Sequence, residues 1–462
     1  MNIADEKYQK MTQMPVRKLI INLSIPTIIS MMISSIYNMA DTFFVGQIGT
    51  SATGAVGISF SLMAIIQAIG FTLGMGSGNY ISRLLGQRDT EDACKVAATS
   101  FFTALGMGAI LTVLGLIFLD PLVRILGATP TILPYAKDYV RYILLGAPFM
   151  TASFVLNNIL RFQGSAFYSM FGIAIGGVLN IALDPLFIFG FGMGTGGAAL
   201  ATIISQFISF CVLLFASGKG GTIKISLKNF TPDWAIYKEI FRTGLPSFYR
   251  QGLASIATIC LNLSAGPFGD AAIAAMSVVT RVFMFALSML LGFGQGFQPV
   301  CGFNYGAKLY GRVLEAFWFC VKVAAVALIF ISIIGFIFAP QIISVFRKDD
   351  LEVIAIGTTA LRLQCLTFPL SSWIIMNNML LQTIGKSRKA SILALARQGL
   401  FFLPSILVLP QLLGLLGIQL SQPIADLCTF LLAVPLGISV IHELQILKEG
   451  EKKNQDSEEV AL

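Results

Sequence analysis

The chain has 462 residues, of which 56% are hydrophobic and only 12% are charged, whereas soluble domains carry about 25% charged residues. This composition excludes an ordinary soluble protein and indicates an integral membrane protein. The net charge of +8 does not indicate nucleic-acid binding, because the basic residues form no patch interleaved with aromatic residues.

Residues 1–18 are polar and are expected to form a cytoplasmic tail. The apolar block that follows is too long for a signal-peptide core and has no cleavage site after it. Further apolar blocks of about 20 residues, the length that a helix needs to cross the hydrocarbon core, recur along the chain. The sequence predicts an all-α membrane protein with twelve spans, at 19–44, 53–80, 93–118, 137–159, 167–190, 195–216, 240–264, 272–300, 314–338, 354–382, 389–411 and 415–442.

Two carboxylates lie in long apolar stretches of the first half, Asp41 in the first span and Asp184 in the fifth. A carboxylate at membrane depth is costly and is usually retained for an ion, a proton or a cationic ligand. Asn180 lies one turn before Asp184 and shares its helix face. At 1.5 Å per residue, Asp41, Asp184 and Thr202 lie roughly 5–11 Å from the outer ends of their spans. Spans 1, 5 and 6 can therefore bring these groups to one level.

This cluster has two interpretations. A static polar network would only fix helix packing, but two acids with no basic partner in these spans are difficult to explain in that way. A cation or proton site explains them better, since two close carboxylates are expected to share a proton. Apart from a sodium ion at Asp41 and Asp184, no metal and no cofactor is expected, because the seven cysteines form no CxxC pair and His442 is the only histidine.

Pro26 and Pro246 lie near the cytoplasmic starts of spans 1 and 7. A proline inside a helix bends it or frees a carbonyl group. Pro26 is therefore either a hinge whose bend follows protonation of Asp41 or a tolerated kink, and the sequence leaves both readings open.

The second half has its own polar groups inside predicted spans, and Asp426 is the only acid well inside one of them. One interpretation is a buried ion pair of Asp426 with Arg397 or Arg281. The other is a second site that responds to protons or substrate.

Lysine and arginine predict the orientation, because cytoplasmic loops carry an excess of both. The tails and the even-numbered loops hold most of them. Both termini are therefore expected in the cytoplasm. The basic residues used for this prediction are Lys7, Lys10, Arg17, Lys18, Arg83, Arg88, Lys95, Arg161, Lys219, Lys224, Lys228, Lys308, Arg312, Lys386, Arg388, Lys389, Lys448, Lys452 and Lys453.

The two halves of the chain are a tandem repeat with an offset of 220 residues. This offset superposes Pro26 on Pro246, Gly86 on Gly306 and the Asn157–Asn158 pair on a second Asn–Asn pair. Six spans per half give both halves one orientation, which predicts two six-helix bundles related by a pseudo-twofold axis along the membrane normal. The predicted domains are an N-terminal lobe (1–216), a cytoplasmic linker (217–236), a C-terminal lobe (237–447) and a cytoplasmic tail (448–462).

Five motifs are specific when taken together: Leu23–Ile28 (LSIPTI), Tyr37–Phe44 (YNMADTFF), Leu179–Pro185 (LNIALDP), Gly292–Pro299 (GFGQGFQP) and Gly302–Lys308 (GFNYGAK). With them the chain resembles the MATE (multidrug and toxic compound extrusion) family, and it looks most like the MepA-like bacterial branch. The resemblance covers essentially the whole chain outside the tails. It implies two lobes arranged as a V around a central cleft, and antiport of organic cations against protons or sodium ions.

The resemblance also implies residue roles. The cation site of the family's N-lobe falls on Asp41, Asn180, Asp184 and Thr202, with Tyr37 and Tyr139 nearby. Some family members bind sodium with a carboxylate in the seventh span. Here that segment, 245–252, contains no acid and carries Arg250, so the resemblance favours the N-lobe site.

The leading hypothesis is a secondary active multidrug efflux antiporter that exports lipophilic organic cations by alternating access. The alternative is a flippase for a lipid-linked saccharide precursor, which would hold a pyrophosphate with several cations. Arg250, Arg281 and Arg397 keep this alternative open, and the paired acids argue against it. No enzyme is expected, since the spans hold no catalytic constellation. The protein is expected to be a monomer in the bacterial cytoplasmic membrane, with no nucleic-acid partner.

Overall fold

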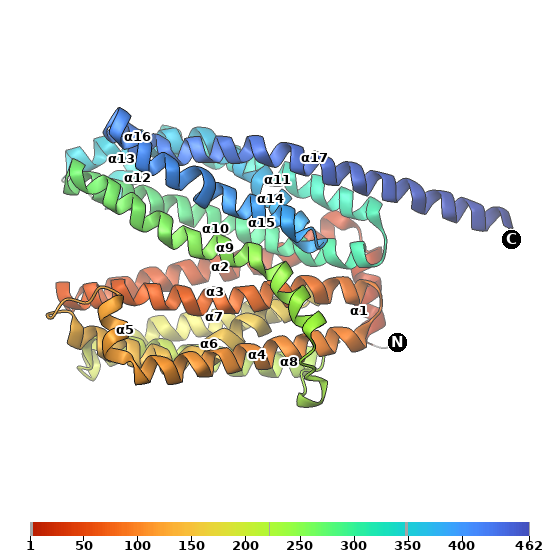
Figure 1. Ribbon diagram of the computed structural model, residues 1–462, viewed down its shortest axis with the longest axis horizontal. Helices are drawn as coiled ribbons and strands as arrows, with labels where there is room; N and C mark the ends of the chain where they lie inside the picture. Colours follow the sequence, from red (N-terminus) through yellow and green to blue (C-terminus); the bar gives the residue numbers. More distant parts are fainter. Residues whose placement is uncertain (1–2, 221, 347–349, 462) are drawn as a thin grey trace.

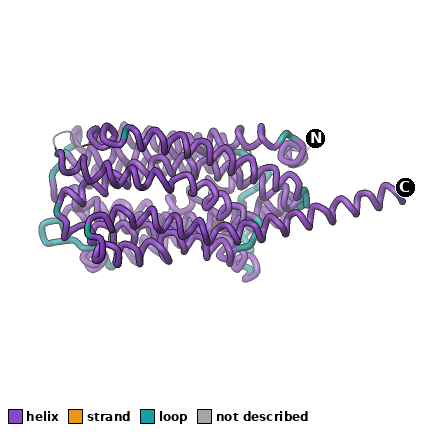
Figure 2. The backbone as a smooth tube through the Cα atoms, turned by 90° about the horizontal axis from the view of Figure 1, so that it is seen from above, coloured by secondary structure: helices purple, strands orange, loops and turns teal. Residues whose placement is uncertain are grey.

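The computed structural model describes residues 3–220, 222–346 and 350–461. The ends of the predicted domains at residues 1–2 and 462 lie outside them. The described part of the chain is built from helices and loops and contains no strand (Figure 2). The helices form two layers, α2–α8 and α9–α17 (Figure 1). Both termini lie at one end of these layers, which we call the terminal end, and we call the opposite end the far end.

Six long helices make the first bundle. The fifth of them, α7, continues into a π-helical turn at Leu186–Gly190. The six are α2 (Val16–Gly46), α3 (Thr50–Gly86), α4 (Thr90–Ile117), α6 (Leu133–Phe162), α7 (Ala166–Pro185) and α8 (Gly194–Gly220).

The second bundle repeats this order with more interruptions. The tenth span is divided into α13 and α14 by a 3₁₀ turn at Phe368–Leu370, and the eleventh into α15 and α16 by a π-helical segment at Ala396–Phe402. Its helices are α9 (Trp234–Ala265), α10 (Asp270–Gly306), α11 (Tyr310–Ile337), α13 (Leu351–Thr367), α14 (Ser371–Thr383), α15 (Ser387–Leu395), α16 (Leu403–Leu413) and α17 (Leu415–Ala461).

Eleven segments of the described chain are long and apolar enough to span a membrane, one fewer than the sequence predicts. The exception is α9, a helix of 32 residues that packs along α3. Arg250 and Gln251 lie in its middle, so no window along it reaches the hydropathy of the other helices. The seventh span is therefore present as a helix but carries polar groups at membrane depth.

The tails differ from the prediction. Part of the expected N-terminal tail is the helix α1 (Ile3–Gln13), which packs against the bundles. The last span does not stop near residue 442, because α17 continues as a helix to Ala461 and projects beyond the terminal end (Figure 1). Short charged segments next to a span can thus extend its helix or dock on the protein, and local composition does not distinguish these outcomes.

The repeat extends to details that the sequence did not predict. Two short helices, α5 (Leu119–Ile125) and α12 (Ala339–Phe346), follow the third and ninth spans at the same offset of 220 residues. Gly49 and Gly269 precede α3 and α10 with φ of 145° and 93°, a region that favours glycine. The two bundles are therefore copies of one design down to their turns.

Glycines join the two bundles in the half nearest the terminal end. A Cβ atom at any of seven glycines would come within 2.7 Å of an atom in the other bundle, so these helices pack with their backbones in contact. We call this set the glycine seam; it consists of Gly76, Gly86, Gly244, Gly292, Gly296, Gly302 and Gly306. Gly86 and Gly306 are symmetry mates in the repeat, and each faces a carbonyl oxygen of the other bundle.

Beyond the seam the bundles separate. On α10, nearly every residue from Leu290 to Asn304 is buried, whereas buried residues from Asp270 to Met289 are interspersed with half-buried and exposed ones. Several hydrogen bonds join the bundles. Among the described residues, the one nearest the far end runs from the Gln251 amide to the Gln67 amide and is 3.1 Å long. The structure thus has two lobes joined at the terminal end, and among the described residues no hydrogen bond joins them beyond Gln67 and Gln251; we call this region between the lobes the cleft.

Candidate functional site

The predicted N-lobe residues converge at the level that helix geometry indicated. Asp41 comes from α2, Asn180 and Asp184 from α7, Thr202 from α8, and Tyr139 from α6. Their exposed fractions are 7%, 2%, 0%, 5% and 0% respectively. Four helices therefore bury these polar side chains together in one lobe.

The Asn180 amide is the centre of the hydrogen bonding. Its Nδ2 group donates to Asp184 Oδ1 and to Thr202 Oγ1, both at 3.3 Å. The Thr202 hydroxyl in turn donates to the carbonyl of Ala198 at 3.1 Å. These bonds fix Asp184 relative to α8 but use only part of its acceptor capacity.

The local sequence explains how the helices approach so closely. Gly177 packs against α2, where a Cβ atom would lie 2.8 Å from Ile33 and 3.4 Å from the Tyr37 ring. Pro185 has no N–H group to continue the α-helical ladder, and the π-helical turn follows directly. Such turns are frequent at functional sites. Asp184 therefore sits where α7 changes its hydrogen-bonding pattern.

Electrostatics set the chemistry of this cluster. The charges of Asp41 and Asp184 repel each other, and no ion pair to either acid is present among the described residues. Four buried oxygens have no hydrogen-bond partner: Asp41 Oδ1, Tyr139 Oη, Asn180 Oδ1 and Asp184 Oδ2. Three of them are obligate acceptors unless a carboxyl group is protonated. The cluster can therefore accept a proton or a small cation.

A site for a divalent or transition metal is not evident. The described residues contain no group of three or more His, Cys, Asp and Glu side chains that could hold a metal ion. The oxygen set around Asp41 and Asp184 is compatible with a proton or a monovalent cation as the transported ion.

The two prolines lie inside continuous helices, Pro26 in α2 and Pro246 in α9. Ser30 Oγ donates to the Pro26 carbonyl at 2.9 Å. Both prolines are at the seam, since Ser24 and Thr27 contact α10 and the neighbour Gly244 contacts α3. Their positions suit a hinge, and that role stays a prediction.

In the C-lobe the structure pairs Asp426 with Arg397. Arg397 Nε donates to Asp426 Oδ1 at 2.8 Å, and Gln422 Nε2 donates to the same oxygen at 2.9 Å. Asp426 is fully buried, and the guanidinium lies 5.5 Å from the centre of the Phe283 ring. Arg281 is exposed and forms no ion pair within the described residues. Of the two partners that the sequence allowed, Arg397 is the one in contact.

The sequence predicts Arg161 in a basic loop, and this prediction is wrong, because Arg161 lies inside α6. Its side chain is 2% exposed and lies between the lobes. Nη1 donates to Gln295 Oε1 and Nη2 to Asn158 Oδ1, both at 2.5 Å. In the sequence, the spacing of three residues places Asn158 and Arg161 on one helix face, and this spacing could have indicated their hydrogen bond. The proximity of Gln295, 134 residues away, exists only in the folded chain.

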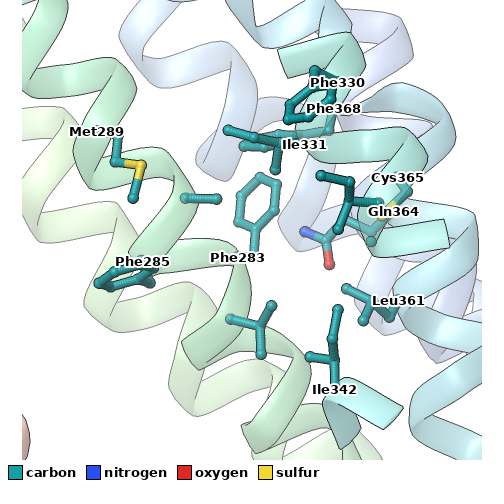
Figure 3. A pocket seen from close by; sticks show the side chains of 14 residues that line it. Phe283, Phe285, Met289, Phe330, Ile331, Ile342, Leu361, Gln364, Cys365 and Phe368 are labelled. Carbon is teal, nitrogen blue, oxygen red and sulfur yellow. The ribbon is translucent and has the colours of Figure 1, made fainter. Parts of the chain in front are cut away.

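A separate cavity of about 380 Å³ lies in the C-lobe between α10, α11, α12 and α13. Its lining is apolar except for the Gln364 amide, which points inward beside Phe283 (Figure 3). No Asp, Glu, His, Lys or Arg side chain lines the cavity, so it offers no charged group to bind a cation. It suits an apolar group or a lipid chain.

The fold and the buried acids together define a membrane transport protein built from two repeated lobes. The MatE family model matches residues 26–186 and 246–407, which is most of the chain, and the chain therefore belongs to the MatE family.

Individual relatives agree with this assignment. The multidrug export protein MepA of Staphylococcus haemolyticus is 30% identical over 430 residues, which are 92% of this chain and 94% of that relative. The crystal structure of MATE in complex with MaL6 matches with a TM-score of 0.90 and 29% identity, and covers 95% of this chain and 99% of that one. The outward-facing conformation of a multidrug resistance MATE family transporter of the MOP superfamily matches with a TM-score of 0.88 and 30% identity, over 94% and 98%. The predicted family and fold class are confirmed.

Proposed function

We propose that the protein exports lipophilic organic cations in exchange for protons, and that Asp41 and Asp184 form the coupling site. The observation that carries this proposal is the burial of two mutually repelling carboxylates that have no basic partner among the described residues. An uncompensated pair of this kind favours uptake of a proton or cation, which removes the repulsion.

The relatives support efflux over other activities. Proteins 28–30% identical along almost the whole chain are multidrug export proteins, and the chain is a multidrug efflux transporter, not an enzyme. The flippase alternative is not favoured by these relatives. Drugs and other organic cations are accordingly the substrate class that we propose.

A proton is the favoured coupling ion for two reasons. Two facing carboxyl groups hold one proton with few other ligands. The seventh span, which would supply a further carboxylate for sodium, has Arg250 and no acid between residues 245 and 252.

Helix α2 offers a direct route from the coupling site to the joint between the lobes. Asp41 lies 14 residues, or about 21 Å, beyond Thr27 on the same helix. The hydroxyls of Thr27 and Ser24 donate to the carbonyls of Gly292 and Phe293 at 2.6 and 3.1 Å. Pro26 lies between these two contacts. A change in the bend of α2 at Pro26 would therefore alter the contacts that hold the terminal end closed.

We further propose that the protein works as a monomer in the bacterial cytoplasmic membrane, with both termini in the cytoplasm. The cleft and the acids all belong to one chain. The basic loops gather at the terminal end, where Arg83 pairs with Glu239 and Lys386 with Glu443. With that orientation, the cleft in this structure faces the outside.

The decisive experiment is dye uptake into inverted membrane vesicles, with pH and sodium gradients imposed separately. We expect the vesicles to take up a fluorescent organic cation when their interior is acidic. This uptake should stop when the pH gradient is collapsed. Uptake that requires sodium and ignores the pH gradient would replace the proton with sodium. No uptake of several cationic dyes, with the protein confirmed in the membrane, would contradict the proposed function.

A further inference from the structure

A second ionic feature lies at the floor of the cleft, where the lobes first meet, and it has the opposite sign to the coupling site. Arg161 is almost fully buried there, and its partners are the neutral oxygens of Gln295 and Asn158 and the sulfur of Met75, which is 3.1 Å from Nη2. Its Nε atom has no hydrogen-bond partner. A buried guanidinium is thus held entirely by uncharged groups.

Arg250 adds a second cation from the other lobe. No ion pair or hydrogen bond of its side chain is found among the described residues, and its charge is close enough to repel that of Arg161. Every residue from Tyr249 to Ser255 is half-buried, so this part of α9 borders accessible space. The neighbouring Gln251 forms the hydrogen bond to Gln67 that marks the end of the cleft.

No acid in the described part of the chain compensates these charges. Among the described residues, Glu239 is the acid that joins the lobes, and it is bonded to Arg83 at 2.7 Å. It also lies 11 residues, about 16 Å, before Arg250 on α9, towards the terminal end. Two cations at membrane depth without a counter-charge are costly, which makes such groups candidates for ligand binding. Arginine is well suited to bind oxyanions, because its guanidinium donates two parallel hydrogen bonds.

We propose that the floor of the cleft is an anion site, in which Arg250 and Arg161 bind the carboxylate, sulfonate or phosphate group of an amphipathic organic compound. The ligand is amphipathic because the site lies at membrane depth between predominantly apolar helices. The site extends the substrates of the transporter to anionic and zwitterionic compounds, and it does not depend on which ion drives transport.

The test is binding to the purified full-length protein in nanodiscs made of phosphatidylcholine, without any ion gradient. The probe is naphthalene-2-sulfonate, and its neutral counterpart is naphthalene-2-sulfonamide, which has nearly the same shape. We expect the sulfonate to bind at least tenfold more tightly than the sulfonamide. Raising the salt concentration should weaken the sulfonate alone, since screening acts on its charge.

Variants assign the effect to this site. Arg250→Gln should weaken sulfonate binding at least tenfold and leave sulfonamide binding within twofold, while Arg250→Lys should retain part of the preference. Arg281→Gln is the matched control, because it removes an equal charge from α10 at an exposed position, and it should change neither affinity. Arg161→Gln is informative if it elutes as a folded monomer; the Arg250 variants decide the question if it does not.

Two results would overturn the proposal: equal binding of the sulfonate and the sulfonamide to the unmodified protein, or sulfonate binding to Arg250→Gln within twofold of its original strength.

A further experiment distinguishes the sources of the anion. If nanodiscs containing phosphatidylglycerol reduce sulfonate binding and Arg250→Gln removes this competition, a lipid headgroup is a natural occupant. If they do not, the natural occupant is a free organic anion. Because no gradient is used, failure here leaves the proposed antiport untouched.

Discussion

At the scale of single residues, charge without compensation is the recurrent feature of this protein. Asp41 and Asp184 face each other in the N-lobe, and Arg161 and Arg250 lie at the floor of the cleft. The Asp426–Arg397 pair shows the contrasting case, in which opposite charges neutralise each other at 2.8 Å. The three arrangements predict different responses to substitution.

Replacement of either acid of the coupling site should uncouple transport. Asp41→Asn and Asp184→Asn keep the shape of the side chain and remove the negative charge, so folding should persist. Gradient-driven dye efflux should fall to the level of membranes without the protein, and substrate binding can remain. Asp270→Asn, an exposed position at the start of α10, is the control and should pump normally. Wild-type rates in both coupling-site variants would place the coupling site elsewhere, with Asp426 the next candidate.

Replacement of Asp426 should instead affect stability. Asp426→Leu leaves the Arg397 guanidinium, only 12% exposed, without its partner, and breaking a buried pair costs about 3–5 kcal/mol. The double variant Asp426→Leu with Arg397→Met removes both charges and should recover most of the loss. Thermal unfolding of the three proteins in one detergent measures this. Equal stability of the single and double variants would show that the pair is not what holds these helices.

At the scale of elements, α1 connects the lobes on the terminal end. On the N-lobe side, Arg88 stacks 4.3 Å from the centre of the Tyr8 ring. On the C-lobe side, Asn304 Nδ2 donates to the Met11 carbonyl at 3.1 Å and Arg312 Nη2 to the Met14 carbonyl at 2.6 Å. Separation of the lobes at this end therefore requires α1 to leave at least one of them.

Arg312→Gln should release α1 from the C-lobe, because it removes the bond to Met14 and the 2.8 Å bond to Asn304 Oδ1. We expect faster hydrogen–deuterium exchange in residues 3–13 and little change in α3. Arg388→Gln, which removes an exposed charge at the same end, is the control. Unchanged exchange in α1 would mean that its remaining contacts, with the N-lobe and with Asn304, suffice to hold it.

At the scale of the whole molecule, the glycine seam determines which end of the cleft is closed. A Cβ atom at Gly86 would lie 2.2 Å from the Phe303 carbonyl oxygen, and one at Gly306 would lie 2.1 Å from that of Arg83. Backbone atoms cannot turn aside as flexible side chains do, so the helices would have to separate. Closure of this end is thus sensitive to a single methyl group.

Gly86→Ala should favour opening of the terminal end and reduce dye efflux at least tenfold. A cysteine at Gln295, buried beside Arg161 in this structure, should become reactive from that side of the membrane. Gly57→Ala lies on the same helix with nothing within 4 Å of its Cβ atom, and it should leave both properties unchanged. Normal efflux and a protected cysteine in Gly86→Ala would show that the seam tolerates separation.

The orientation of the whole molecule has its own test. Single cysteines at Gln47 and Asp270, both exposed at the far end, should react with an impermeant maleimide added outside intact cells. A cysteine at Lys224, in the predicted linker, should react only after the cells are opened. The unmodified chain gives the background from its native cysteines. Outside labelling at Lys224 would reverse the proposed topology.

The sequence by itself determined the features that follow from local periodicity and from the cost of charge in lipid. Apolar blocks of span length fixed the helices, the offset of 220 residues fixed the repeat, and depth along each helix was enough to place Asp41, Asp184 and Thr202 together. Each of these depends on distances along one helix or on a comparison of the two halves, so no tertiary information was needed.

Only the tertiary structure decided which groups meet across the lobes. The contact of Arg161 with Gln295, the choice of Arg397 over Arg281 and the docking of α1 depend on how separate helices cross and rotate. A small rotation of a helix exchanges one polar neighbour for another at little cost in apolar burial. The pattern of residues along the sequence therefore does not determine these polar contacts. The closed terminal end has the same origin, since it arises where glycines of both lobes bring their backbones into contact.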